Sequence, residues 1–358
     1  MDKILKIGII GCGGIANGKH MPALKKVEGV EMVAFCDIIK ERAEKAAKEF
    51  GTPDAMVYED YKELLKDESI DVIHVCTPNR SHSFISIDAL EAGKHVMCEK
   101  PMAKTYAEAK AMCEAAERTG KKLTIGYQNR QTAEAQYIKA ACDAGELGEI
   151  YYGRAIALRR RAVPTWGVFL DAEAQGGGPI IDLGVHVIDL TRYLMGNPKP
   201  VSVYAVASNR LGDRKFIKTG PGWVPEDAKE DDVCTVEDFA TALIRYDNGA
   251  CTYLETSYDI NGEDIGKKQL FGTKGGMDLS NGVKLYTTVN DFMADIDVKT
   301  ANYKGGCDMF VAEMSHFIDC VKNGTECLAK AEDGITVMKI LDAIYESART
   351  GHEVVIAN

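Results

Sequence analysis

A glycine-rich turn near the start of the chain strongly limits the fold. The apolar run Leu5–Ile10 leads into Gly11-Cys12-Gly13-Gly14-Ile15-Ala16, and helical periodicity follows from Ala16 to Val27. This segment matches G-x-G-x-x-A, where the first glycine allows a tight turn, the second lets the backbone approach a pyrophosphate, and the small third residue lets helix and strand pack closely. The helix N-terminus offers free N–H groups to phosphates, so the pattern predicts a dinucleotide-binding turn.

A second feature supports this interpretation. The strand pattern Val30–Cys36 ends at Asp37, whose carboxylate can accept hydrogen bonds from ribose hydroxyls. Because an acidic residue there repels a 2′-phosphate, we expect NAD rather than NADP, a preference that nearby Lys40 and Arg42 weaken. The alternative is a glycine turn in an α/β domain that binds no ligand.

Strand and helix patterns alternate through the first third of the chain. Helical patterns at 40–50, 61–65, 81–92 and 105–119 are separated by strand patterns at 72–76, 95–98 and 123–127. This alternation is typical of βαβ units in a doubly wound parallel sheet, so we expect the α/β class.

The pattern changes after about residue 125. Residues 201–207 alternate with period two, and Asp247-Asn248-Gly249 separates two strand-like runs, a hairpin signal. Further strand patterns at 267–271, 277–279 and 283–287 precede helical patterns at 310–321 and 335–348. We therefore expect a Rossmann-type domain at 1–125 and a substrate-binding and oligomerisation domain with an antiparallel or mixed sheet at 126–358. The last helix could pack back on the first domain.

Composition excludes several classes of protein. The net charge is −11, and no block of Lys and Arg is long enough to follow a phosphate backbone, which argues against nucleic acid. No apolar run approaches a membrane span, and the N-terminus lacks the order of regions of a signal peptide, so we expect a cytoplasmic protein with no membrane partner. The eleven cysteines contain no C-x-x-C, which predicts reduced thiols and no metal site.

Two segments carry candidate catalytic groups. Glu99-Lys100-Pro101 follows a strand, so Lys100 is expected at the ligand-binding edge of the sheet. After the triple glycine 176–178, Asp182, His186 and Asp189 are spaced i, i+4 and i+7, which places them on one helical face. A histidine or a lysine can take a hydroxyl proton near neutral pH. The alternative is an Asp–His pair that only anchors the helix.

Together these motifs resemble the Gfo/Idh/MocA oxidoreductase family. The resemblance rests on the glycine turn with Asp37, Thr77-Pro78-Asn79 followed by His82, Glu99-Lys100-Pro101, and Asp182-x-Gly-x-His186. It implies an N-terminal Rossmann domain, a C-terminal α/β domain with an open, mostly antiparallel sheet, and a cis bond before Pro101. It also implies that Lys100, Asp182 and His186 are catalytic, with His186 as the acid/base and Lys100 binding the substrate oxygen.

The resemblance further implies a set of cofactor contacts and an assembly. The expected cofactor-binding residues are Gly11, Gly13, Gly14, Ile15, Asp37, Thr77, Pro78, Asn79, His82, Glu99 and Lys100. The family commonly buries the exposed face of the C-terminal sheet between subunits, so we expect a homodimer or homotetramer.

Other residues are candidates for the substrate site. Trp166 could stack on a sugar ring, and one of Arg159, Arg160 and Arg161 could bind hydroxyls or an anionic group. The expected substrate-binding residues are Lys100, Arg130, Trp166, Asp182, His186 and Asp189. The alternative is a solvated basic edge with Trp166 in a small apolar cluster. His20, His74, His95, His316 and His352 are expected to be structural or exposed.

Three functions remain open at this point. The first is an NAD-dependent dehydrogenase that acts on a secondary hydroxyl of a sugar, sugar derivative or cyclitol. The second is a redox-assisted glycosidase in which NAD is regenerated in each turnover, and the third is a non-catalytic dinucleotide sensor. Accumulation of NADH distinguishes the dehydrogenase from the glycosidase. A sensor has no need for Lys100, Asp182 and His186.

Overall fold

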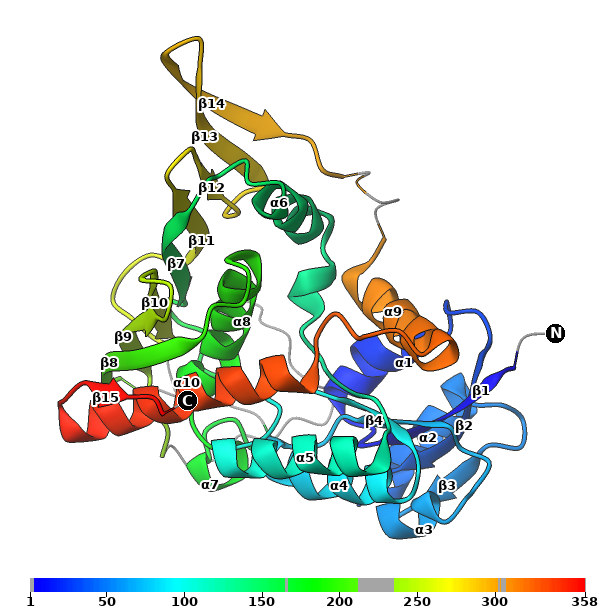
Figure 1. The fold of residues 1–358 in the computed structure, drawn as a ribbon. Coiled ribbons are helices and arrows are strands. Elements are labelled where there is room, and N and C mark those ends of the chain that lie inside the picture. Colours follow the sequence, from blue (N-terminus) through cyan, green and yellow to red (C-terminus); the bar gives the residue numbers. More distant parts are fainter. Residues whose placement is uncertain (1–2, 165–166, 212–234, 302, 304–306, 358) are drawn as a thin grey trace. The chain divides into compact units, whose positions relative to one another are not determined.

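The computed structural model describes residues 3–164, 167–211, 235–301, 303 and 307–357. The chain divides into two compact units (Figure 1). The first comprises residues 1–128 and 307–335, and the second comprises residues 129–306 and 336–358.

The first unit is a Rossmann fold. Its six strands pair in parallel in the order β3-β2-β1-β4-β5-β6, as the doubly wound interpretation predicted. Its elements are β1 (Leu5–Ile10), the π-helix η1 (Ala16–His20), α1 (Met21–Leu24), β2 (Val30–Cys36), α2 (Lys40–Phe50), β3 (Met56–Tyr58), α3 (Tyr61–Leu65), β4 (Val72–Val75), the 3-10 helix η2 (Asn79–Ser81), α4 (His82–Glu91), β5 (His95–Cys98), α5 (Tyr106–Thr119), β6 (Leu123–Ile125) and α9 (Met309–Asn323).

Local sequence signals explain several boundaries in this unit. The Thr105 side chain accepts from the Glu108 N–H, and the Glu108 side chain reaches back to the Thr105 backbone, so the two residues form a capping box at the start of α5. Gly120 ends the same helix at φ 66°. Helix α9, from the far end of the chain, buries Phe310, Met314 and Phe317 in the apolar core that β1 and α1 also line.

The second unit is built on a nine-stranded sheet in the order β14-β13-β12-β11-β7-β10-β9-β8-β15. Only β7 and β10 pair in parallel, so the sheet is mixed and mostly antiparallel, as expected. The elements from the end of the first unit onward are the 3-10 helix η3 (Gln128–Gln131), α6 (Ala133–Asp143), β7 (Ile150–Leu158), α7 (Ala172–Gln175), the π-helix η4 (Ile180–Gly184), α8 (Val185–Leu194), β8 (Pro200–Ser208), β9 (Phe239–Tyr246), β10 (Cys251–Ser257), β11 (Ile265–Gly272), β12 (Gly276–Asp278), β13 (Val283–Val289), β14 (Phe292–Val298), α10 (Ala331–Thr350), which begins in the first unit, and β15 (Val354–Val355).

The hairpin predicted at Asn248-Gly249 is present. Gly249 adopts φ 84°, and β9 and β10 pair on either side of the turn. The sequence patterns had not indicated β3, β7, β14 or β15. Strand β7 contains Gly153, a residue that ordinarily weakens a strand, but a Cβ there would approach Thr191 Cγ2 of α8 to 2.8 Å. The glycine therefore allows α8 to lie close against the centre of the sheet.

Candidate functional site

The glycine turn of the first unit leaves room for a phosphate group. Gly11 has φ 90°, and a Cβ on it would fall 2.7 Å from the backbone carbon and oxygen of Cys76, so the turn packs directly on the end of β4. At Gly13, by contrast, no atom beyond the adjacent residues lies within 4 Å of an added Cβ. The chain therefore provides both the tight turn and the open backbone that a bound pyrophosphate requires.

Asp37 lies beside this turn and is fixed by it. Its carboxylate accepts the backbone N–H of Cys12 at 2.8 Å with one oxygen and that of Ile39 at 2.9 Å with the other. A carboxylate offers about four acceptor positions, so both oxygens keep capacity for a ribose diol. Burial, and to a smaller extent the charge of Asp37, raises the pKa of the Cys36 thiol to about 12. The thiol next to Asp37 is therefore neutral.

His82 connects two of the predicted cofactor loops. Its Nδ1 lies 2.7 Å from the Pro101 carbonyl oxygen and its Nε2 lies 2.7 Å from the Thr77 carbonyl oxygen, while the residue is 1% exposed. Both ring nitrogens thus face protein carbonyls. This geometry favours a structural role for His82 over the cofactor contact that the resemblance implied. The Lys100–Pro101 bond is cis, as expected.

Glu99 is buried beneath the Lys100 loop. It is 5% exposed, with one oxygen 2.7 Å from His20 Nε2 and the other accepting the Lys100 backbone N–H at 3.1 Å. His20 and His74, for which the sequence showed no recognisable spacing, meet in the same cluster, with their Nδ1 atoms 3.2 Å apart.

In the second unit, Glu237 holds the loop that precedes Asp182 and His186. Its carboxylate accepts the backbone N–H groups of Gly178 at 3.0 Å and Ile180 at 2.9 Å, and the Tyr345 hydroxyl donates to it at 3.0 Å. Burial raises the pKa of Glu237. A Cβ on Gly177 would fall 1.8 Å from the Tyr345 hydroxyl oxygen, so a side chain there would displace the tyrosine.

Asp182 and His186 begin the helix that this loop introduces. Asp182 lies in the π-helical turn η4 and His186 in the first turn of α8, and both are partly exposed. The Tyr258 hydroxyl donates to Asp182 Oδ2 at 3.0 Å. Burial and the Asp182 charge hold the pKa of Tyr258 well above its usual range, so the phenol remains a donor. π-Helical turns are frequent at functional sites.

Asp189 and Arg130 are engaged with each other. Arg130 Nε and Nη2 donate to the two Asp189 oxygens at 3.0 and 2.6 Å, and each side chain is 1% exposed. A buried two-point ion pair of this kind favours a supporting role under the α8 helix over the direct substrate contact that we expected for both residues.

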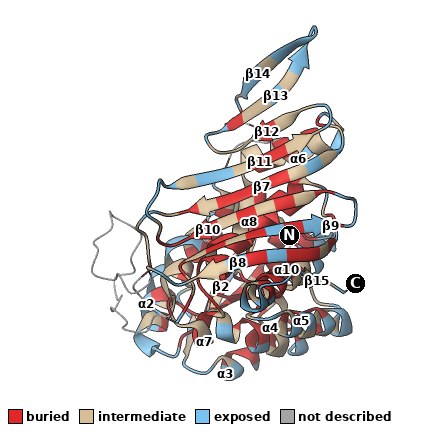
Figure 2. Ribbon diagram, turned by 90° about the vertical axis from the view of Figure 1, so that its left-hand side faces the viewer, coloured by how far each residue is buried: buried red, intermediate tan, exposed pale blue. Residues whose placement is uncertain are grey.

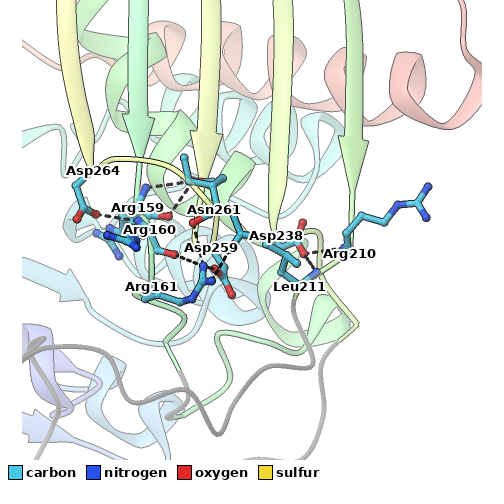
Figure 3. A network of polar contacts seen from close by, with 11 residues as sticks. Arg159, Arg160, Arg161, Arg210, Leu211, Asp238, Asp259, Asn261 and Asp264 are labelled. Carbon is cyan, nitrogen blue, oxygen red and sulfur yellow. Dashed lines mark hydrogen bonds and ion pairs between the residues drawn. The ribbon is translucent and has the colours of Figure 1, made fainter.

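The three consecutive arginines have different surroundings (Figure 3). Arg161 pairs with Asp259 and donates to the Ile260 carbonyl and the Asn261 side chain, so its guanidinium is part of a structural network. Arg160 is exposed, and its backbone N–H donates to Asp264 at 2.9 Å. Arg159 is partly buried and close enough to Tyr258 for its charge to act on that phenol. Trp166 lies outside the described residues.

Comparison with known families decides the assignment. Residues 5–127 match the model of an oxidoreductase family with an NAD-binding Rossmann fold, and residues 135–278 match the Gfo/Idh/MocA C-terminal domain. The chain belongs to the Gfo/Idh/MocA family. This Gfo/Idh/MocA protein is an NAD-binding oxidoreductase, as the motifs had indicated.

Relatives of known activity extend along almost the whole chain. D-glucoside 3-dehydrogenase of Escherichia coli is 35% identical, over 98% of this chain and 97% of that protein. The scyllo-inositol 2-dehydrogenase (NAD(+)) of Bacillus subtilis is 27% identical, over 98% of this chain and 96% of that protein. A levoglucosan dehydrogenase solved with NADH and L-sorbose superposes with a TM-score of 0.87 at 25% identity, and each chain is covered completely. Among the helices that the structure describes, none is both long and apolar enough to cross a bilayer.

Proposed function

We propose that this family member is an NAD-dependent dehydrogenase that oxidises a secondary ring hydroxyl of a sugar, sugar derivative or cyclitol. The observation that carries the proposal is the helix of the second unit on which Glu237 fixes the N-terminus and Tyr258 holds Asp182, with His186 one turn further on. This arrangement prepares an acid/base group and its carboxylate partner for one reaction. The activities of the glucoside and inositol dehydrogenases to which the chain is similar support the substrate class.

Each catalytic side chain then has a defined task. NAD, when bound at the glycine turn, would supply the acceptor for the hydride of the carbinol carbon. Lys100 donates a hydrogen bond to the hydroxyl oxygen, and His186 accepts the proton that this oxygen loses. Asp182, kept in place by Tyr258, stabilises the imidazolium that results.

Substrate selection is assigned to a smaller set than the sequence suggested. Since Arg130 and Asp189 bind each other, we assign them to the support of α8. Arg161 is likewise occupied by Asp259. Arg160 is exposed, whereas Arg159 is partly buried and its charge acts on Tyr258, the partner of Asp182. Arg159 is therefore the arginine assigned to ring hydroxyls, and Trp166 is proposed to cover an apolar ring face. The E. coli relative supports a glucoside oxidised at carbon 3 as the first substrate to test.

A panel of substrates tests the proposal. Steady accumulation of NADH is measured at 340 nm with glucosides, free hexoses, sugar acids, inositols and, for contrast, linear alcohols and 2-hydroxy acids. We expect accumulation with at least one polyhydroxylated ring compound. Oxidation confined to linear alcohols or 2-hydroxy acids would overturn the substrate class, and turnover without free NADH would favour the glycosidase alternative.

The preference for NAD is expected to depend on Asp37. Asp37→Ser should weaken NAD binding and narrow its advantage over NADP, because the carboxylate that accepts from the ribose diol and repels a 2′-phosphate is removed. Dissociation constants of both reduced cofactors, measured by fluorescence titration, check this. Asp54→Ser, on the loop before β3, is the matched control. A wild-type preference for NADP that the Asp37 variant leaves unchanged would contradict the assignment.

We propose that the exposed face of the large sheet forms the interface of a homodimer or homotetramer. Tyr204 of β8 lies opposite Leu243 of β9, and both are exposed, as is Val206 two positions along β8 from Tyr204. Figure 2 shows exposed segments on these strands. An apolar sheet face of this kind requires cover. We expect light scattering at micromolar concentration to give at least twice the mass of one chain, and Leu243→Glu to lower it. A wild-type monomer would contradict this proposal.

We also propose a cytoplasmic location. The ten described cysteines are unpaired, which suits a reducing compartment.

A further inference from the structure

Three buried titratable side chains form a hydrogen-bonded cluster under the Lys100 loop of the first unit. Glu99 follows β5, His20 ends η1, and His74 lies on β4, so they come from three separate elements. Glu99 Oε1 lies 2.7 Å from His20 Nε2, and His20 Nδ1 lies 3.2 Å from His74 Nδ1. Both histidines are 0% exposed.

The hydrogen-bond directions in this cluster follow from its two ends, Glu99 and His74. A carboxylate can only accept, so His20 Nε2–H donates to Glu99 in either charge state of the histidine. Burial, together with the His20 charge, holds the pKa of His74 well below its usual range, so His74 is neutral. When His20 is also neutral, its Nδ1 accepts from the Nδ1–H of His74. The two rings meet edge to face, with centroids 5.5 Å apart.

At its Glu99 end, the cluster reaches the Lys100 loop. The second Glu99 oxygen accepts the backbone N–H of Lys100 at 3.1 Å. On the opposite side of Lys100, the Pro101 carbonyl is held by His82 at 2.7 Å. A Cβ on Gly126 would lie 3.3 Å from Glu99 Oε1, so the carboxylate is closely surrounded. The Lys100 backbone is therefore fixed on both sides by buried side chains.

The far end of this hydrogen-bonded cluster is buried at His74. Among the described residues, His74 Nε2 is buried and has no hydrogen-bond partner. The cluster is thus suited to holding a carboxylate in one place, since a buried charge requires directed donors to remain there.

We propose that His20 is a positioning residue for hydride transfer, which acts through Glu99 on the backbone of Lys100 and is itself oriented by His74. This inference rests on the proposed role of Lys100 in the oxidation. It assigns a function to two histidines that contact neither the glycine turn nor the catalytic helix in any described hydrogen bond.

The test compares two substitutions at the same position. His20→Leu removes the donor to Glu99, whereas His20→Gln places an amide N–H near the position of Nε2. In single-turnover stopped-flow experiments with saturating NAD, we expect His20→Leu to lower the rate constant of NADH formation about 10–100-fold, the scale of a misplaced catalytic group. His20→Gln should stay within about threefold of wild type, and the NADH dissociation constant within about threefold in both variants. His352→Leu, at an exposed histidine, is the control.

A second readout does not require a substrate. The rate at which trinitrobenzenesulfonate labels Lys100, followed by peptide mass spectrometry, reports the placement of its amine. We expect His20→Leu to change this rate and His20→Gln to restore it, with Lys110 labelled equally in all proteins. The labelling rate tests the placement of Lys100 independently of the proposed function. The proposed function fails separately if none of the tested sugars or cyclitols supports reduction of NAD by the wild-type protein.

Either of two results would overturn the inference. One is a folded His20→Leu protein with wild-type hydride transfer and wild-type Lys100 labelling. The other is a loss of NADH affinity as large as the loss of rate, which would make the cluster a cofactor-binding element. If His20→Leu does not fold, His74→Leu and His74→Asn replace it. The asparagine keeps a donor toward His20 Nδ1, so it should retain the rate that the leucine loses, and equal rates in both would overturn the inference.

Discussion

Lys100→Met is expected to lower kcat by about 10²–10⁴-fold while NAD affinity stays near the wild-type value. Methionine preserves much of the side-chain volume but removes the ammonium to which we assign the hydrogen bond to the reacting hydroxyl. The backbone of this residue, held by Glu99 and followed by Pro101, does not depend on the side chain, so the loop should keep its conformation. Steady-state kinetics with the best substrate from the panel, together with NADH fluorescence titration, measure both effects.

A matched variant controls for the loss of a lysine. Lys110→Met removes an exposed ammonium on α5 that pairs with Glu114 at 3.7 Å, and it should leave kcat unchanged. Wild-type kcat in Lys100→Met would show that the Glu99-Lys100-Pro101 motif is structural in this protein.

Asp189→Ala is expected to lower the free energy of unfolding by about 3–5 kcal/mol. Arg130 would then keep a guanidinium that is 1% exposed and has lost a two-point carboxylate partner. The Tyr193 ring, 4.6 Å from the guanidinium carbon, cannot replace a carboxylate. Urea unfolding followed by circular dichroism measures the change.

A double substitution separates the lost pair from the lost packing. In Arg130→Met/Asp189→Leu no charge is left behind, so most of the stability should return. Asp143→Ala, at an exposed aspartate that ends α6, is the control and should change stability by less than about 0.5 kcal/mol. If Asp189→Ala is as stable as this control, the pair does not support α8.

Much of the first unit could be predicted because its signals are local. Gly11 and Gly13, the capping residues Thr105 and Glu108, and Gly120 each act within a few positions of the element that they define. The G-x-G-x-x-A turn was recognised for the same reason, because its residues are consecutive in the sequence. Strand β7 was missed because the reason for Gly153, the close approach of α8, lies about forty residues further along the chain.

The supporting residues of the site depend on contacts that spacing does not reveal. Glu237 caps a loop 57–59 positions before it, and His20 meets Glu99 across 79 positions. Nothing in the neighbourhood of these residues distinguishes them from ordinary buried or surface groups. Arg130 and Asp189, by contrast, were predicted to contact the substrate. Their polarity was visible in the sequence, whereas their mutual pairing required the fold.

The most direct test of the account follows a labelled hydrogen atom. The ring compound that reduces NAD fastest is prepared with deuterium on its carbinol carbons. The NADH that forms is isolated, and its mass is measured by mass spectrometry. The account predicts one deuterium in each NADH molecule, an oxidised sugar or cyclitol in equal amount, and slower turnover than with the unlabelled compound. Reduced cofactor that carries no deuterium would contradict the central claim that this protein transfers hydride from a ring carbon to NAD.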